Sequence, residues 1–582
     1  MSIIKNLEIE LKEIINNNGY NINKIDLEPS NRPELGDYQI NECFNLARVL
    51  KKNPREIAED FKNIIEKDKR FTNINIAGPG FLNISLSEEY LKEILNSINK
   101  DIYVNIDKEP YKDVIIDYGG ANVAKALHVG HLRSANLGEA LKRLGKLLGL
   151  NVIGDAHLGD YGRPIGFVML EIQKRFPDLE FFNENYNGDY NDIELPIDEK
   201  DLETIYPVAS QKAKDDPNYL EEGRIMTSKF QSKTKGYYEL SKKIVELSKK
   251  DIKGIYDKLN VNFELWLGES DAVEYVDELT KIFEENNLLI ESDGAKIVEL
   301  KNENDKAPMP PLIFLKSNGT ISYETTDLAT ILSRKKEYNP DEIWYLVDER
   351  QRLHFDQVFR AARMAKLVDD DVNLEFIGFG TMNGKDGKPF KTRSGGVMNL
   401  KDLIELVNEE TSKRIVNESI KGDERDDIAE KVAISALKYA DFIPYRGTDY
   451  VFEIEKFADL EGKTGPYLLY STIRMKSLLE KAKNLKQENI KAISSDTEKD
   501  IALTILDMPN MLTRSLKIKS LNEIADYLFR LTSKYNKFYS ENKIIIEKDL
   551  EKQESWLVLT NIVYKINMLL LNVLGIEVPN KM

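Results

Sequence analysis

The sequence predicts a multidomain α/β protein, in which a small α+β domain precedes a parallel-sheet domain and an all-α domain ends the chain. Its 582 residues exceed what one hydrophobic core normally holds, so several domains are expected. From Val114 a strand, a glycine-containing loop, a helix and a second strand follow one another within about 40 residues, which is typical of a parallel sheet. From Asn399 onward nearly every segment has helical periodicity.

Residues 1–95 are predicted to form the α+β domain. The opening stretch, MSIIKNLEIELKEII, interleaves acidic and apolar residues and indicates an amphipathic helix, not a signal peptide. Asn53 and Pro54 mark a helix start, because Asn caps helices and Pro fits the first turn. Residues 73–86, NINIAGPGFLNISL, alternate on both sides of Gly-Pro-Gly, which predicts two strands joined by a turn.

Residues 108–398 are predicted to form a Rossmann-like domain. VIIDY ends at Gly119, and a helix with leucines at helical spacing separates it from a strand over residues 151–154. Residues 176–260 turn to polar loops and charged helices and are expected to be an insertion. Further strands of the same sheet are expected at AKIVEL, PLIFLK, IWYLVD and LEFIGFG.

The remaining chain is predicted to be helical, with a connective region over residues 399–460 and a terminal domain over residues 461–582. The net charge is −17, but from Leu478 to the end 16 Lys and Arg face 14 Asp and Glu. This tail is either a charged helical surface whose signs balance or a surface that can approach phosphate. Charge alone favours the first interpretation.

Composition excludes several classes of protein. With 41% hydrophobic and 31% charged residues, the chain is neither disordered nor an integral membrane protein, and no run approaches the roughly 18 apolar residues of a spanning helix. Cys43 is the only cysteine, which excludes disulfides within the chain and zinc sites with several cysteines. A cytoplasmic location without membrane attachment is expected.

All four histidines follow predicted strands, where open α/β sheets bind ligands: His128, His131, His157 and His354. Any one of them could instead be an internally satisfied polar residue. A metal site at HVGH is possible, but it lacks a cysteine or an HExxH pattern, so no zinc is expected. A phosphate site is favoured. Gly130 would let the backbone approach a ligand, the helix start would offer free N–H groups, and imidazoles can donate to developing charge.

These residues also carry a resemblance. HVGH resembles the HIGH signature of class I aminoacyl-tRNA synthetases, and the wider phrase DYGGANVAKALHVGHLRS is similar to arginyl-tRNA synthetases. Further phrases of that family follow in order, and the first 95 residues resemble its N-terminal add-on domain. The resemblance covers essentially the whole chain, the insertion least securely. The later phrases are SYETTD, DERQRLHFDQVFRAAR, KDGKPFKTRSG and EGKTGPYLLYSTIR.

The resemblance implies an arginine–tRNA ligase and a site for each substrate. Guanidinium needs planar carboxylate or carbonyl acceptors, and the family pattern places Asp117, Asn122, Tyr323, Asp327 and Gln351 around arginine. Each could otherwise be a strand-end or capping residue. Such hydrogen-bonding pockets discriminate by about 10⁴–10⁵, which fits the lack of a visible editing module.

The resemblance further implies ATP, with Mg²⁺ carried on its pyrophosphate and not in a protein cage. The expected ATP contacts are His128, Gly130, His131, His354 and Thr392.

One departure from the family concerns the second signature, KMSKS, which reads Phe390-Lys391-Thr392-Arg393-Ser394 here. Phe390 replaces the first lysine, while Arg393 can stand for the second. Lys125, just upstream of HVGH, is therefore expected to supply the main positive charge. Lys391 or Lys388 is the alternative if the loop shifts. The catalytic set is thus Lys125, His128, Gly130, His131, Lys391 and Arg393.

For tRNA, the resemblance assigns residues 461–582 to the anticodon arm and residues 1–95 to the outer corner of the L. Aromatic stripes at helical spacing can equally be core. The candidate contacts are Phe81, Asn83, Tyr467, Tyr470, Arg474, Arg514, Arg530 and Tyr535.

The predicted reaction joins arginine to the terminal adenosine of its tRNA through arginyl-adenylate, with bound tRNA required for the first step. A monomer is expected, because every tRNA-contacting part occurs in one chain. The alternatives are another H-x-G-H nucleotidyltransferase, which would not need the terminal domains, and a catalytically silent tRNA-binding paralogue, which would have lost HVGH.

Overall fold

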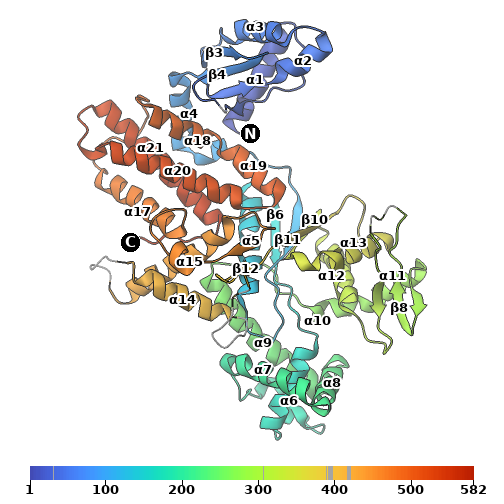
Figure 1. Ribbon diagram of the computed structural model, residues 1–582. Helices are drawn as coiled ribbons and strands as arrows, with labels where there is room; N and C mark the ends of the chain where they lie inside the picture. Colours follow the sequence, from blue (N-terminus) through green and yellow to red (C-terminus); the bar gives the residue numbers. More distant parts are fainter. Residues whose placement is uncertain (31, 304, 306, 389, 391–397, 416–420) are drawn as a thin grey trace.

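A computed structural model describes residues 1–582 except 31, 304, 306, 389, 391–397 and 416–420. In Figure 1 the N-terminal domain lies at the top and the C-terminal helices form a bundle at the left. The central sheet lies between this bundle and a smaller lobe that contains β8, α11 and α13, and a helical lobe with α6, α7 and α8 extends below it. The sheet therefore lies between the bundle and the two lobes, whereas the N-terminal domain lies against the bundle.

The N-terminal domain is an α+β unit with an antiparallel sheet of order β1-β2-β4-β3. The side chain of Asn53 accepts the N–H of Arg55, so the helix begins at Pro54 as predicted, and residues 73–86 form the expected hairpin. The elements are α1 (Ile3–Asn17), β1 (Glu28–Pro29), β2 (Tyr38–Ile40), α2 (Glu42–Leu50), α3 (Pro54–Ile65), β3 (Phe71–Ala77), β4 (Phe81–Leu86) and α4 (Glu88–Lys100).

The central sheet is parallel throughout, in the order β11-β10-β5-β6. Helix α5 (Val129–Leu147) crosses from β5 to β6, which confirms the predicted β-α-β unit. The chain passes from β5 to β6 on one side and later returns to β10 on the other side of β5. Such a reversal of strand order is where a crevice is expected, at the carboxyl end of β5. The strands are β5 (Asp113–Asp117), β6 (Asn151–Asp155), β10 (Glu342–Asp348) and β11 (Asn373–Phe379).

Two of the expected strands do not belong to this sheet. AKIVEL and PLIFLK form β8 (Ala295–Val298) and β9 (Leu312–Leu315). They belong to a separate antiparallel sheet in which β8 pairs with β9 on one side and with β7 (Ile290–Ser292) on the other. Asp293 and Gly294 both have positive φ and make the two-residue turn between β7 and β8. Asp-Gly is a strong hairpin signal, so the expectation that these strands extend the parallel sheet was wrong for a recognisable reason.

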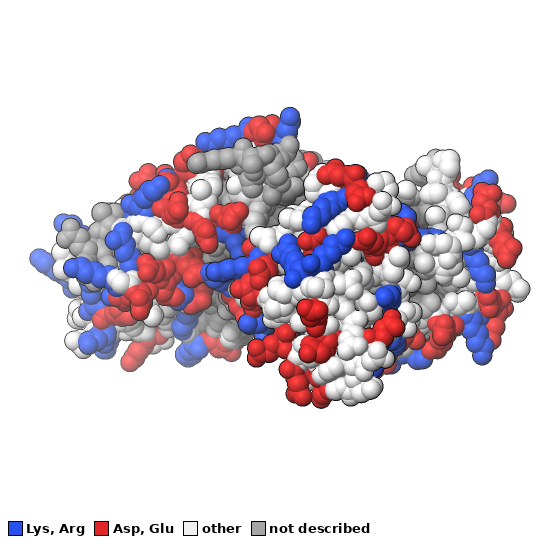
Figure 2. Space-filling view, turned by 90° about the horizontal axis from the view of Figure 1, so that it is seen from below, with Lys and Arg blue, Asp and Glu red and all other residues white. Residues whose placement is uncertain are grey.

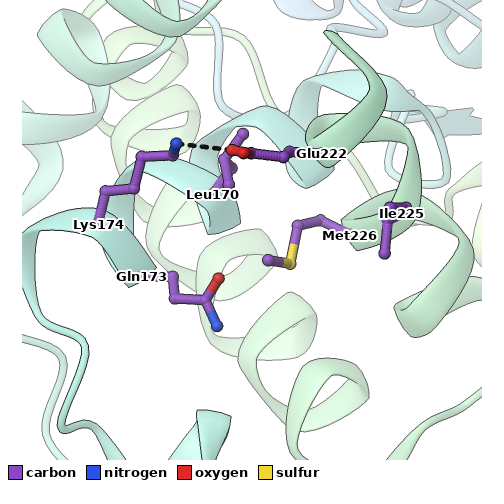
Figure 3. Close-up of a pocket in the computed structure, with 6 residues that line it drawn as sticks. All are labelled: Leu170, Gln173, Lys174, Glu222, Ile225 and Met226. Atoms are coloured by element: carbon purple, nitrogen blue, oxygen red, sulfur yellow. Dashed lines mark ion pairs between the residues drawn. The ribbon is translucent and has the colours of Figure 1, made fainter. Parts of the chain in front are cut away.

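The helical lobe lies within and beside the expected insertion. It is made of α6 (Arg163–Arg175), α7 (Glu199–Asp215), α8 (Pro217–Gln231) and α9 (Lys235–Lys258). A surface pocket of about 320 Å³ lies between α6 and α8, and the pair of Lys174 and Glu222, 2.6 Å apart, closes one side of it (Figure 3). Among the predicted site residues that the structure describes, none lines this pocket.

Three further helices and three short elements complete this part of the chain. The helices α12 (Tyr323–Tyr338) and α13 (Arg352–Met364) flank β10 in sequence, and β12 (Met382–Asn383) pairs with β13 (Tyr450–Val451). The short helix α10 (Glu269–Ala272) precedes α11 (Val276–Glu285).

The C-terminal part is helical, as predicted. Its last helix, α21, has the length and composition to cross a membrane, but 67% of its most apolar window is buried within the protein. Asn567, near the end of α21, donates to the hydroxyls of Thr472 and Thr532, which is typical of a helix inside a bundle. The helices are α14 (Leu400–Ser412), α15 (Asp423–Phe442), α16 (Ile454–Phe457), α17 (Gly465–Lys481), α18 (Asp496–Leu506), α19 (Met508–Ile518), α20 (Asn522–Glu541) and α21 (Leu550–Val573).

The bundle contacts both the N-terminal domain and the helix α5 that crosses the central sheet. Lys565 of α21 donates to the carbonyl of Asn99 in α4 at 2.7 Å. Seven residues further along α21, Nη1 of Arg143 in α5 donates to the carbonyl of Asn572 at 2.9 Å. Asn260, which accepts from Nη2 of Arg143, donates in turn to the carbonyl of Gly575. The terminal helix is thus fastened to the N-terminal domain and to the crossover helix of the sheet.

Candidate active site

The two imidazoles of HVGH accept main-chain hydrogen bonds at the start of α5. Nδ1 of His128 accepts the N–H of Gly130, and Nδ1 of His131 accepts the N–H of His128, both at 3.0 Å. A neutral imidazole that accepts at Nδ1 carries its proton on Nε2. Burial lowers the pKa of His131 to about 3, and burial with the charge of Lys125 lowers that of His128. Both rings are therefore neutral at pH 7. Their N–H contacts assign the ring proton to Nε2, and Nδ1 of His131 also lies 3.3 Å from the carbonyl oxygen of His128.

This arrangement corrects the expectation of free N–H groups at the helix start. The N–H of Val129 donates to the carbonyl of Met398, and that of His131 donates to the carbonyl of His128. The N–H groups of His128 and Gly130 are taken by the rings. A Cβ at Gly130 would lie 2.7 Å from Cε1 of His128, so the glycine makes room for a histidine. Phosphate would meet the imidazoles and not bare backbone.

The flanks of the second signature are attached to the first. Asn399 pairs with His128 in an antiparallel bridge, and the N–H of Leu400 donates to the carbonyl of Leu127. Phe390 accepts the N–H of Met398 through its carbonyl, and its ring lies 6.1 Å from that of Phe452. Phe390 is therefore a packing residue. Lys391, Thr392 and Arg393 lie outside the described residues.

The ANVAK loop is held in an unusual backbone conformation. Ala124 has φ +66°, in the left-handed region that costs a non-glycine residue about 1–2 kcal/mol. Its N–H donates to Oγ of Ser248 in α9 at 3.1 Å, which fixes the turn. Lys125, the next residue, lies over the ring of Tyr206 at 5.0 Å. The charge of Lys125 lowers the pKa of both histidines, so it acts on the same region.

Asn122 lies on the same loop, where it bridges to the segment after β6. The N–H of Val123 donates to the carbonyl of Gly159, and a Cβ at Gly159 would lie 2.6 Å from Oδ1 of Asn122. The side chain of Asn122 is exposed beside this close backbone approach.

Acidic side chains surround the carboxyl end of β5. Asp117 ends β5, and Asp327 lies one turn into α12 and accepts a hydrogen bond from Nε2 of His354 at 2.5 Å. Burial opposes protonation of His354, but the hydrogen bond and charge of Asp327 raise its pKa overall. His354 is thus hydrogen-bonded to Asp327, a residue expected to bind the substrate arginine. The sequence had suggested that His354 contacts ATP. Tyr323 begins α12 and is 63% exposed, and Gln351 is exposed at the start of α13.

Three residues of this region were missed by sequence reasoning. Asp155 ends β6 in register with Asp117, and Nη2 of Arg334 donates to both carboxylates, at 2.6 and 2.7 Å. Glu269 starts α10, and burial together with the charge of Asp327 raises its pKa to about 7. The end of the strand NVIGD was a signal for Asp155. The sequence of residues 265–268 has no strand pattern. It therefore did not predict that this segment runs beside β6 and brings Glu269 close to the carboxyl end of β5.

A metal ion is one possible occupant of the strand ends. Ligand atoms of Asp117, Asp155 and His157 lie within 4.8 Å of one another. However, the guanidinium of Arg334 already contacts both carboxylates and supplies the positive charge. The acidic cluster around Asp117 is therefore better suited to an organic cation.

Three family models match consecutive parts of the chain. The arginyl tRNA synthetase N-terminal domain covers residues 1–86, the catalytic domain of the class I (R) tRNA synthetases residues 90–454, and the DALR anticodon-binding domain residues 468–582. The chain belongs to the arginyl-tRNA synthetase family.

Sequence relatives of this family match over the full length. An arginine–tRNA ligase of Alkaliphilus oremlandii is 42% identical over 100% of both chains. One of Agathobacter rectalis is 40% identical over 95% of each chain.

Solved structures of arginyl-tRNA synthetases share the fold. The enzyme of Plasmodium falciparum has a TM-score of 0.81 at 24% identity, covering 100% of this chain and 99% of its own. That of Thermus thermophilus has 0.76 at 18% identity, covering 100% of both. The predicted three-part architecture is therefore confirmed for this member of the arginyl-tRNA synthetase family.

Two candidate tRNA contacts prove to be internal. Asn83 and Tyr535 are each 1% exposed, and the hydroxyl of Tyr535 donates to Thr560 inside the bundle. Both candidates were wrong for the folded protein, because alternation and helical spacing placed the side chains in the core.

The other candidate contacts are accessible to different degrees. Phe81 packs against Phe44 with ring centroids 4.7 Å apart. Arg474 lies over the rings of Tyr470 and Tyr539. The remaining three are Tyr467, which is half-buried, and Arg514 and Arg530, which are exposed and paired with acids.

Charge is not concentrated on the face of this family member shown in Figure 2. Lys and Arg are interspersed there with Asp and Glu, over the helical lobe as elsewhere. That face therefore gives no support for a broad basic surface.

Proposed function

We propose that the chain ligates L-arginine to its cognate tRNA in two steps, as a part of protein synthesis. The arginine carboxylate attacks the α-phosphate of ATP, which gives arginyl-adenylate and releases pyrophosphate. The 2′-hydroxyl of the terminal adenosine then attacks the adenylate carbonyl, which gives arginyl-tRNA and AMP. The observation that carries this proposal is a cluster of acidic side chains at the end of β5 in a protein whose α5 begins with two neutral imidazoles that can donate from Nε2.

In the arginine pocket, carboxylates would receive the substrate guanidinium. Asp117, Asp327 and Glu269 supply negative charge from three different elements, and bidentate pairing suits a planar guanidinium. Tyr323 and Gln351 lie exposed at the starts of α12 and α13, where they would close around the ligand. Asn122 would meet the arginine amino or carboxylate group from the ANVAK loop. A carboxylate is already nucleophilic, so this step requires positioning more than a general base.

For ATP, the donors are the rings of His128 and His131. Their Nε2–H groups would bind phosphate oxygens as charge develops on them. Lys125 would supply the positive charge that the altered second signature lacks, with Lys391, Thr392 and Arg393 as further contacts. Gly130 permits the His128 ring to sit over the helix start. Mg²⁺ would enter with ATP as part of the substrate.

For tRNA, the DALR domain supports binding of the anticodon arm by residues 461–582, and the N-terminal domain would meet the outer corner of the L. Phe81, Tyr467, Tyr470 and Arg474 are the proposed contacts there, together with Arg514 and Arg530. We place the enzyme in the cytoplasm as a monomer, since both terminal domains and the catalytic domain occur in one chain.

Arginine-dependent exchange of pyrophosphate into ATP tests this function, run with and without tRNA and with lysine as the control amino acid. We expect exchange with arginine in the presence of tRNA and none with lysine. No exchange with tRNA present would refute the enzyme activity. Faster exchange with another amino acid would refute the specificity.

A further inference from the structure

Two aspartates stand side by side at the ends of β5 and β6, but their oxygens are used differently. Asp155 is fully buried, with Oδ1 accepting the N–H of Leu267 at 3.3 Å and Oδ2 accepting from Arg334 at 2.6 Å. Asp117 accepts from Arg334 only through Oδ2, and within the described part of the chain no hydrogen bond reaches its Oδ1. Its side chain is 15% exposed. Asp117 therefore keeps one oxygen for a ligand, and Asp155 keeps none.

We propose that Arg334 is a positioning residue for the arginine site: it bridges the two aspartates and aims the free oxygen of Asp117 at the incoming guanidinium. This inference rests on the proposed function, since it takes Asp117 as a ligand of the substrate. Arg334 itself does not touch the substrate, because its side chain is 0% exposed behind Asp117.

The charges at this point explain why a bridge is needed. Asp117 and Asp155 are register partners on adjacent strands, and two buried carboxylates so close would otherwise share a proton. A guanidinium is permanently charged, so Arg334 offsets one carboxylate. His157 faces the same pair, and its pKa is raised, despite its burial, by the hydrogen bond and charge of Asp155 and by the charge of Asp117. Nη2 alone makes both hydrogen bonds of Arg334. Asp117 is the carboxylate with an unpaired oxygen, so it is the one that can still accept from a ligand.

One face of α12 carries both this bridge and the opposite wall of the pocket. Tyr323, Asp327, Thr330 and Arg334 recur at helical spacing, so they lie on one side of the helix. Thr330 contacts Nε2 of His157 at 3.3 Å, which places that face against the strand ends. A single rigid helix thus sets where Asp117 points and where Asp327 stands. The distance between the two carboxylates that would hold the guanidinium follows from this geometry.

Titration of Asp117 depends on every group that faces it. These are Arg334 from α12, Asp155 from β6, His157 from the loop after β6, and Tyr345, its register partner on β10. Burial raises the pKa of Asp117, and the charge of Arg334 opposes that rise. Removing Arg334 would therefore let Asp117 hold a proton at higher pH.

Steady-state pyrophosphate exchange at saturating tRNA tests the role of Arg334. Arg334→Met should raise the KM for arginine about ten- to a hundredfold, the range for a lost hydrogen bond between charged groups. The KM for ATP should change less than about twofold, and Arg334→Lys should restore part of the arginine affinity. The ratio of variant to wild-type KM for arginine should fall as the pH rises, because Asp117 ionises again. Lys336→Met, an exposed change on the same helix, is the matched control and should behave as wild type.

Other results would overturn the inference. An arginine KM close to wild type in Arg334→Met, an equal rise for ATP, or a ratio independent of pH would each do so. If that variant does not fold, the double variant Arg334→Met/Asp155→Asn decides, because removing both charges should recover folding and an ionised Asp117.

A further variant separates this inference from the proposed function. Asp117→Asn must itself raise the arginine KM. If it does not, the assignment of Asp117 to the arginine pocket fails. If it does while Arg334→Met has no effect, only the role of Arg334 fails.

Discussion

The main-chain N–H of His128 donates to Nδ1 of His131 at 3.0 Å, one turn further along α5. The same N-terminal turn therefore orients both rings and fixes their protons on Nε2, as long as each ring stays neutral. Gly130 belongs to this arrangement because a side chain there would meet the ring of His128.

A double-mutant cycle tests whether Gly130 serves the ring or the nucleotide. Gly130→Ala should slow adenylate formation about 10²-fold, comparable with losing one charge-stabilising donor, without changing the arginine KM. In a His128→Ala background the same glycine change should cost almost nothing, because the ring it displaces is gone. Pre-steady-state rates of exchange measure both effects. Additive losses would mean that the backbone at Gly130 contacts ATP directly.

Lys125 is expected to carry much of the positive charge for phosphate. Lys125→Ala should slow adenylation about tenfold or more and leave the Kd for tRNA within about twofold. The control is Lys250→Ala, which removes an exposed lysine paired with Glu199 on the neighbouring helix. A normal rate for Lys125→Ala would transfer the role to Lys391 or Arg393 in the second signature.

Glu269 predicts a pH dependence of arginine binding. Its pKa is raised to about 7 by burial and by Asp327, so it is mostly protonated below that pH and ionised above it. Since a guanidinium favours the ionised form, the arginine KM should fall as pH rises through about 7 and then level off. Glu269→Gln should flatten this profile at the weaker, low-pH affinity. Steady-state exchange kinetics at several pH values measure the arginine KM, and calorimetric titration measures the corresponding Kd. An unchanged pH profile in the variant would contradict the assignment.

Ala124 predicts opposite effects for two small substitutions. Ala124→Gly relieves a left-handed conformation and should change the free energy of unfolding by less than about 1 kcal/mol, since the flexible unfolded chain offsets the gain. Ala124→Val should lower it by more than about 1 kcal/mol, because a branched side chain is disfavoured at this φ. Urea unfolding compares them, with Ala126→Val as the matched control on the same loop. Equal stability of the glycine and valine variants would show that the backbone is not strained.

Contacts with tRNA should follow exposure. Arg514→Gln should raise the tRNA KM several-fold and reduce its salt dependence by about one phosphate contact. Tyr535→Phe removes a hydroxyl inside the bundle and should leave that KM unchanged. Aminoacylation at several salt concentrations makes the comparison. An effect of Tyr535→Phe on tRNA affinity without loss of stability would mean that the bundle opens on binding.

Local patterns predicted much of the fold. The strand at 114–118, the leucine periodicity of α5 and the caps around Pro54 each specify a local structure with a short-range cause, and all three were confirmed. The same holds for HVGH, whose spacing placed two rings at a helix start. The Asp293-Gly294 dipeptide is an equally clear hairpin signal, but the strand that follows it was assigned to the larger parallel sheet.

The acidic pocket could not be derived in the same way. Asp117, Asp155, Glu269 and Arg334 come from four elements, and only tertiary packing brings them together. A buried arginine also looks like any helical surface residue in a sequence such as ILSRKKEY, because its partners lie more than a hundred residues away. Burial is likewise what separated Asn83 and Tyr535 from the accessible tRNA candidates.

Arg143 sits on α5 about 20 Å from the phosphate-facing turn, at about 1.5 Å per residue, and holds the last turn of α21. The last turn of α21 is thus hydrogen-bonded to α5, the helix whose N-cap is His128. A helix of this length is stiff along its axis, so its two ends move together. Any movement of α21 against the sheet must therefore either break the hydrogen bond between Arg143 and Asn572 or displace the N-terminal turn of α5, which carries the imidazoles that would bind ATP.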